Sequence, residues 1–135
     1  MEAQWVELQD YVDRLEQFAS QVRSLAQEKR QALTNADTAA LEEIMIREEK
    51  LLPLGLHLKD VPPLVVEKGL TGACAEAPLE IREQVTAACN RIGLYLGEAR
   101  EINRRNMMFL KKALEYVGFM IKCSTTGPSY QPPAR

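Results

Sequence analysis

Several residue types are scarce in this chain of 135 residues, and each scarcity excludes a class of function. His57 is the single histidine, which excludes a histidine-rich metal site, and no nucleophile-elbow sequence lies near it to complete a Ser-His-Asp triad. No apolar run approaches the ~18 residues that span a membrane. The first residues are too acidic and too interrupted for a signal peptide. We therefore expect a cytoplasmic protein without membrane insertion.

The three cysteines, Cys74, Cys89 and Cys123, are an odd number, lie far apart in the sequence and form no CxxC motif. We expect each to be a small core or loop residue rather than a disulfide partner or a nucleophile. The formal net charge is -2, whereas a dedicated nucleic-acid-binding protein usually carries a basic excess. We expect no catalytic residue, no metal, no cofactor and no nucleic-acid partner.

Glycine and proline are absent from the first 52 residues, and proline is absent from residues 79–126. Helix-breaking residues gather instead between these two tracts: Pro53, Gly55, Pro62, Pro63, Gly69, Gly72 and Pro78. Two long helical tracts therefore flank a broken middle segment. The last ten residues, TGPSYQPPAR, contain three prolines. We expect a helical domain over residues 1–123 and a flexible tail over residues 124–135.

Apolar residues recur at steps of three and four through the first tract, and Lys29 is the one polar residue in this series. A second apolar row lies beside the first: Tyr11, Phe18, Leu25 and Ala32. The combined stripe is wider than the seam of a coiled-coil dimer. We expect this helix to contact two neighbours.

The middle of the chain predicts two shorter helices. Asp37 is a suitable N-cap for the first of them, and Pro53 predicts a kink or a stop in it. Asp60 is a candidate cap for the second, with Pro62 and Pro63 in its first turn and Gly69 at its end.

The third tract predicts a helix of about 70 Å over residues 78–123, against about 45 Å for the first helix. It must overhang the first helix or be covered at one end by the middle segment. No strict alternation predicts a strand. The expected fold is all-α: an elongated antiparallel bundle of three main helices, with long first and third helices and a second helix broken by prolines.

One row of residues on the third helix is polar or lacks a side chain in its first half and is apolar in its second half: Thr86, Gly93, Arg100, Met107, Leu114 and Ile121. Excess apolar surface on a small protein marks an interface, and methionines suit a groove that accepts a partner helix. The alternative is ordinary core, covered by the middle segment. Periodicity alone leaves both interpretations open.

Charge is uneven along the same helix. Residues 100–122 carry six basic and two acidic side chains, a net charge of +4. This segment is either a solvated face or a region that attracts an acidic partner. Asn103 and Asn106 interrupt the apolar seam, where an asparagine can fix helix register or offer its amide to a partner.

The segments LEEIMIREEKLLPL and NRIGLYLGEAREINRRNMMFLKKALEYVGFM resemble the FlgN-like flagellar export chaperones. The residues that carry the resemblance are Leu41, Ile44, Glu48, Leu51 and Leu52 in the first segment and the asparagine pair Asn103 and Asn106 in the second. The resemblance extends over most of residues 5–121.

The resemblance implies a cytoplasmic, non-enzymatic chaperone of type III flagellar export. Its implied clients are FlgK-like and FlgL-like hook-filament junction proteins, whose C-terminal helical segments it would cover to prevent premature assembly before docking at an FlhA-like export gate. The client-binding candidates carried over by position are Asn106, Met107, Leu110, Leu114, Val117 and Ile121, and Tyr130 is the candidate for gate docking.

Three other functions were weighed. A phosphotransfer bundle would use His57, whose surroundings lack the expected spacing, and a chorismate-mutase-type enzyme would need several inward cations where only Lys29 is found. A generic helical scaffold, or a secretion chaperone for a different client, shares the expected fold and differs in its partner.

Overall fold

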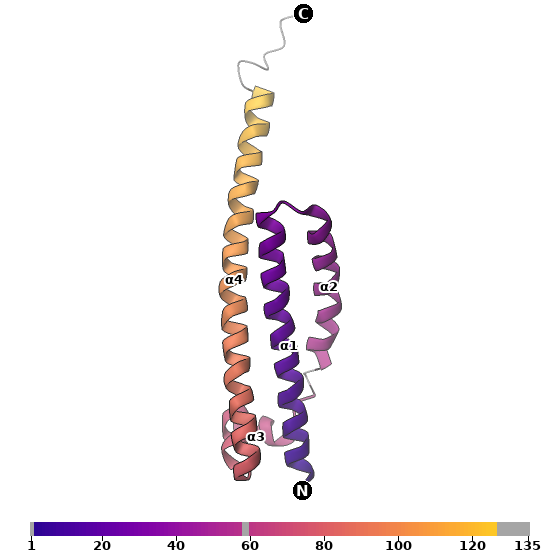
Figure 1. The fold of residues 1–135 in the computed structure, drawn as a ribbon, viewed down its shortest axis with the longest axis vertical. Helices are drawn as coiled ribbons and strands as arrows, with labels where there is room; N and C mark the ends of the chain where they lie inside the picture. The colour runs from indigo at the N-terminus through magenta and orange to yellow at the C-terminus, as the bar shows by residue number, and fades with distance from the viewer. Residues whose placement is uncertain (1, 58–59, 127–135) are drawn as a thin grey trace, which may run out of the picture.

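The computed structural model describes residues 2–57 and 60–126, which form four helices (Figure 1). In chain order they are α1 (Ala3–Thr34), α2 (Thr38–His57), α3 (Pro63–Glu76) and α4 (Leu79–Thr126). These residues include no strand, so the all-α prediction is confirmed. None of the helices described combines the length and the apolarity that crossing a lipid bilayer requires.

The directions of the long helices alternate along the chain. A turn over residues 35–37 reverses α1 into α2, so these two helices are antiparallel (Figure 1). α4 runs beside α1 in the same direction, because Glu16 pairs with Arg91 at 2.9 Å and Arg23 pairs with Glu98 at 3.3 Å, a constant offset of 75 residues. The expected antiparallel arrangement therefore applies to successive helices, whereas α1 and α4 are parallel.

α1 is the central helix of the molecule. It contacts α2, α3 and α4, whereas α2 and α4 make no contact with each other in the described part of the chain. The sequence predicted two neighbours for this helix, whereas α1 has three, and its apolar surface is divided between two separate cores. The main core joins α1 to α3 and α4 through Leu8, Val12, Ala73, Val85 and Ile92, among others. A smaller core joins α1 to α2 through Leu25, Ala32 and Ile44.

The turn into α2 satisfies the free backbone groups at both helix ends. Asp37 accepts a hydrogen bond on Oδ1 from the amide of Ala40 at 3.0 Å, which confirms the predicted N-cap. Ala36 has a φ of 52°, and its amide bonds to the carbonyl of Leu33. The helix then passes Pro53 and ends at His57, so a stop at Pro53 is wrong. A proline inside a helix removes a single amide donor, and the helix continues beyond that loss.

α3 differs from its sequence prediction at both ends. Pro62, rather than Asp60, is the N-cap residue, and it caps the helix without a side-chain hydrogen bond. Gly69 interrupts α3 with a φ of 75°, but the helix resumes and ends at Glu76. A residue with a side chain would be strained at that φ. α3 packs near the start of α4, where the Sγ atoms of Cys74 and Cys89 lie 3.8 Å apart, although these residues are distant in sequence.

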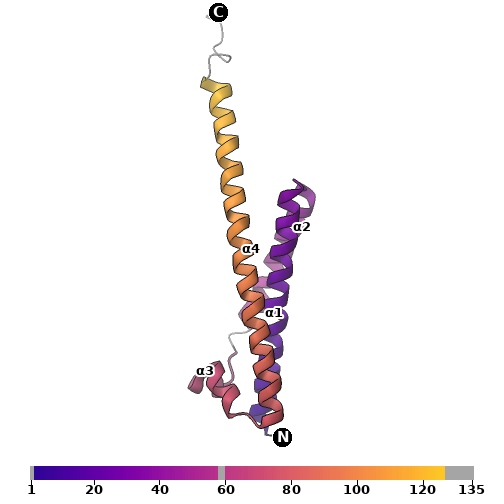
Figure 2. The same ribbon diagram turned by 60° about the vertical axis from the view of Figure 1, so that its left-hand side comes forward.

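α4 extends far beyond the end of α1 (Figures 1 and 2). With 48 and 32 residues, the two helices are about 72 Å and 48 Å long. α3 lies at the opposite end of α4 from this overhang, as Figure 2 shows. The expected boundary at residue 124 falls within the helix, which continues to Thr126. The rest of the expected tail, residues 127–135, lies outside the described residues.

Candidate functional site

The overhang of α4 exposes a large amount of apolar surface. Asn106 is the last buried residue of α4 among those described, and residues 111–124 are all exposed. Leu114 is 70% exposed and Met107 is 68% exposed. α3 packs at the far end of the helix, so the alternative that the middle segment covers this surface is wrong.

The predicted client-binding residues, apart from Asn106, lie together on one side of the overhang. We define the distal row as Met107, Leu110, Leu114, Val117 and Ile121. All are exposed except Leu110, which is half-buried.

The distal row continues the side of α4 that faces α1. At 3.6 residues per turn, the buried residues of α4 fall within an arc of about 60°. They are Ile81, Val85, Ala88, Ile92, Ala99 and Asn106. The distal row falls within an arc of about 80° that overlaps this arc. It therefore lies where a helix would pack if it occupied the position beyond the end of α1.

Asn106 differs from the other predicted residues. Its side chain is 4% exposed, and its Nδ2 donates a hydrogen bond to the backbone carbonyl of Ala26 at 3.2 Å. The amide is thus used to join α4 to α1, whereas Asn103 is exposed. An asparagine in this seam could fix helix register or offer its amide to a partner. Asn106 uses its amide within the chain, so we do not include it in the distal row.

A second set of apolar side chains lies on another side of the overhang, and the sequence analysis did not assign it to the site. We define the aromatic row as Met108, Phe109, Tyr116, Phe119 and Met120, all of which are exposed. Its centre lies about 160° around the helix from that of the distal row. These residues form a second apolar set at helical spacing, and this spacing could have been recognised in the sequence.

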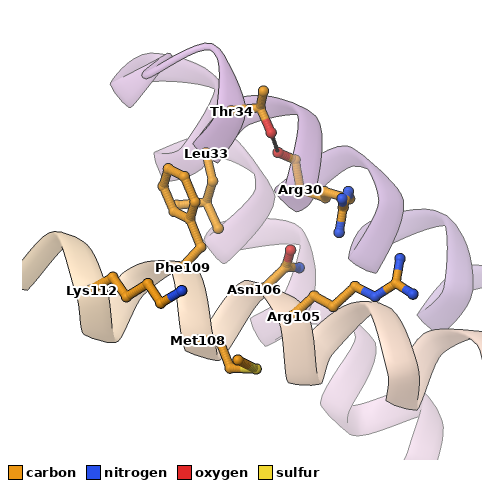
Figure 3. A pocket seen from close by; sticks show the side chains of 8 residues that line it. All are labelled: Arg30, Leu33, Thr34, Arg105, Asn106, Met108, Phe109 and Lys112. Atoms are coloured by element: carbon orange, nitrogen blue, oxygen red, sulfur yellow. Dashed lines mark hydrogen bonds between the residues drawn. The ribbon is translucent and has the colours of Figure 1, made fainter.

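A cleft of about 270 Å³ opens at the fork where α4 separates from the end of α1 (Figure 3). We call it the basic cleft. It is lined by Arg30, Leu33, Thr34, Arg105, Asn106, Met108, Phe109 and Lys112. Three of these residues are cationic and none is acidic. Figure 3 shows Phe109 beside Leu33, with side chains from both helices around the opening.

The cations of the basic cleft differ in their partners. Arg105 pairs with Glu101 at 3.2 Å, and Arg104 contacts the same carboxylate at 2.7 Å. Hydrogen bonding from Arg104, with Arg105 nearby, lowers the pKa of Glu101 to about 2. Arg30 and Lys112 form no salt bridge with any residue that the structure describes. The cleft therefore keeps a positive charge at the base of the apolar overhang.

The described residues give little support to metal binding or to cysteine reactivity. They contain no group of three or more His, Cys, Asp or Glu side chains that could hold a metal ion. Burial, together with the neighbouring Cys89 thiol, raises the pKa of Cys74 to about 12, which disfavours the reactive thiolate. Tyr130, the candidate for gate docking, lies outside the described residues.

The comparison with protein families gives one match, to the FlgN protein family, and it covers residues 1–130. No curated protein and no solved structure matches the chain. The family match includes all four helices and the whole overhang of α4. The chain therefore belongs to the FlgN family, whose members are cytoplasmic, non-enzymatic export chaperones for the flagellar hook-associated proteins FlgK and FlgL.

Proposed function

We propose that the distal row of α4 binds the C-terminal helical segment of a FlgK-like or FlgL-like client and thereby prevents its premature assembly. The observation that carries this proposal is the exposure of Leu114 and Val117 beyond the end of α1, and of Met107 beside its last turns. These residues continue the stripe that α1 covers in the first half of α4. A client helix bound here would take a position in line with α1.

The size of the distal row suits reversible binding. Complete burial of an apolar side chain of this kind contributes about 1.5–3 kcal/mol. Part of that contribution is offset by the ordering of the client segment, which costs several kcal/mol or more. The surface can therefore hold a client firmly enough to block assembly and still release it during export.

The sequence contains no nucleotide-binding motif, so energy for release must come from outside this chain. We infer that release takes place at an FlhA-like export gate, and that Tyr130 contributes to docking there. Support for this step comes from the family resemblance of the chain. Deletion of residues 124–135 should abolish gate binding and leave client binding unchanged. Equal gate binding by the full and shortened chains would contradict the role of Tyr130.

The substitution Leu114→Asp tests the distal row, because it places a charge in the middle of the proposed interface. We expect it to weaken binding of the FlgK-like protein from the same organism by at least 100-fold, measured by titration calorimetry. Helicity and melting temperature should not change, since Leu114 is 70% exposed.

Leu94→Asp is the matched control. Leu94 lies on the same helix and is 57% exposed, but it is outside the overhang. We expect this variant to bind the client as the unaltered chain does. Equal losses in the two variants, or loss of helicity in Leu114→Asp, would show that the distal row is not the binding surface. Binding of an unrelated secretion substrate in place of the FlgK-like protein would favour the alternative of a chaperone for another client.

A further inference from the structure

We propose that the basic cleft and the aromatic row form a second client-binding surface, which takes a helical segment carrying a carboxylate side chain. The inference rests on the proposed function in one respect: the helical segment belongs to the same client. It adds a separate surface, a chemical requirement on the client, and residues outside the distal row.

The charge of the cleft favours an anionic group. Arg30 and Lys112 approach it from different helices, and neither forms a salt bridge within the described part of the chain. The nearby acid Glu101 is already held by Arg104 and Arg105. A carboxylate in the cleft would therefore meet two available cations, one of them a guanidinium that can bind it through two hydrogen bonds.

The same cleft also has an apolar lining. Leu33, Met108 and Phe109 contribute apolar surface beside the cations (Figure 3). Its volume of about 270 Å³ is below the range of about 300–1,000 Å³ that is typical of small-molecule sites. The cleft suits one acidic side chain on an apolar carrier better than a free cofactor.

The aromatic row is continuous with the cleft, because it begins there with Met108 and Phe109. From Phe109 to Met120 the row follows α4 for about 16 Å, or three helical turns. An amphipathic helix lying along this row can place an acidic side chain in the cleft and apolar side chains on Tyr116 and Phe119, which are 65% and 62% exposed. Charge and shape thus identify the same kind of partner.

The geometry also separates this surface from the distal row. The two rows lie on different sides of α4, and one straight helix packs against a single stripe of its neighbour. A client that covers both rows must supply two helical segments. The net charge of +4 over residues 100–122 favours a segment of acidic character on at least one of them.

The test compares two adjacent lysines of α4. Lys112→Glu reverses a charge in the cleft, whereas Lys111→Glu makes the same change about 100° away on the helix and outside the cleft. Both side chains are exposed, so both variants should fold. The probe is the full-length FlgK-like protein from the same organism, titrated at about 50 mM and 500 mM salt.

We expect Lys112→Glu to weaken binding about three- to tenfold at the lower salt concentration, and the loss to shrink at the higher one. Lys111→Glu should change binding less than twofold. Arg30→Glu, on the opposite wall of the cleft, should reproduce the effect of Lys112→Glu. Equal effects of Lys111→Glu and Lys112→Glu, or no effect of either, would overturn the cleft as a specific site.

A charge-exchange experiment between client and chaperone identifies the client carboxylate that binds in the cleft. Acidic residues in the helical ends of the client are replaced by lysine one at a time. The correct replacement should weaken binding to the unaltered chaperone and restore binding to Lys112→Glu. If no replacement restores binding, the client carboxylate is excluded as the ligand of the cleft.

Phe119→Ser tests the aromatic row separately. It should weaken client binding by a factor that does not depend on salt, because the lost contact is apolar. Unchanged binding would remove the aromatic row from the surface.

The results distinguish this inference from the proposed function. Loss of binding in Leu114→Asp with no difference between Lys111→Glu and Lys112→Glu would retain the distal row and reject the cleft. Unchanged binding in Leu114→Asp with a clear loss in Lys112→Glu would reject the distal row and retain the cleft.

Discussion

Asn106 donates a side-chain hydrogen bond of 3.2 Å to the backbone carbonyl of Ala26, across the interface of α1 and α4. Asn106 is the last buried residue of α4 among those the structure describes. Beyond Leu110, which is half-buried, residues 111–124 of α4 are all exposed. This contact therefore stands at the boundary between the part of α4 that stabilises the fold and the part that is available to a partner.

The substitution Asn106→Ala should lower the free energy of unfolding by about 1–2 kcal/mol, because it removes a buried hydrogen bond and packing at the interface. Urea denaturation followed by circular dichroism measures this change. Asn103→Ala is the matched control, since Asn103 is an exposed residue one turn earlier in α4. It should leave stability unchanged or slightly raised, given the higher helix propensity of alanine. Equal destabilisation of the two variants would contradict the structural role of Asn106.

The ion pair of Glu16 and Arg91 should make the stability of the fold depend on pH. Arg91 donates two hydrogen bonds of 2.9 Å to the Glu16 carboxylate. These bonds lower the pKa of Glu16 below its ordinary value of 4.5, because their effect is larger than the opposite effect of partial burial. Because the pKa is lower in the folded state, the pair stabilises the fold above pH 4.5. This contribution is lost as the pH falls through the pKa of the folded state.

Melting temperatures of the unaltered chain and of Glu16→Gln should therefore differ by about 1–3 °C at pH 7. The difference should disappear as the pH falls well below 4.5. Glu7→Gln serves as the control, because Glu7 is exposed on the same helix and has no salt bridge within the described residues. A difference that persists in acid would show that Glu16 contributes through packing rather than charge.

The cysteines should react at very different rates. Cys123 is exposed, whereas Cys74 is buried beside Cys89 and its pKa is raised to about 12. Since the thiolate is the reactive form, iodoacetamide at pH 8 should alkylate Cys123 at least ten times faster than Cys74. Peptide mass spectrometry measures both rates, and denaturant should make them similar. Rapid alkylation of Cys74 in the native protein would show that the packing of α3 on α4 does not shield it.

Much of the fold could be predicted from the sequence, because its helices depend on local spacing. The apolar rows of the first tract predicted a helix with more than one neighbour, and α1 packs against three helices rather than the two expected. Asp37 could be identified as an N-cap from the sequence, because its carboxylate accepts a hydrogen bond from the amide of Ala40, which is three residues away. The excess length of the third tract predicted either an overhang or cover by the middle segment, since helix length follows directly from the number of residues.

Other features depend on contacts between distant residues, and the sequence pattern did not contain them. Cys74 and Cys89 meet because α3 folds back on the start of α4. The two asparagines of α4 have the same chemistry, but Asn106 faces α1 and Asn103 faces solvent. Of the kink or stop expected at Pro53, the stop is wrong because α2 continues to His57. Gly69 ends the first helical segment of α3 as expected, but a second segment follows it to Glu76, and the local pattern did not predict that segment.

The sequence by itself determined that this chain forms long amphipathic helices and that residues 107–121 carry more apolar side chains than one neighbouring helix can cover. Local periodicity contains that information, because side-chain direction along a helix repeats every 3.6 residues. Only the tertiary structure decided that these side chains are exposed and that Arg30 and Lys112 flank the same cleft. Exposure depends on where α1 ends and α3 packs, and such contacts join residues far apart in the chain.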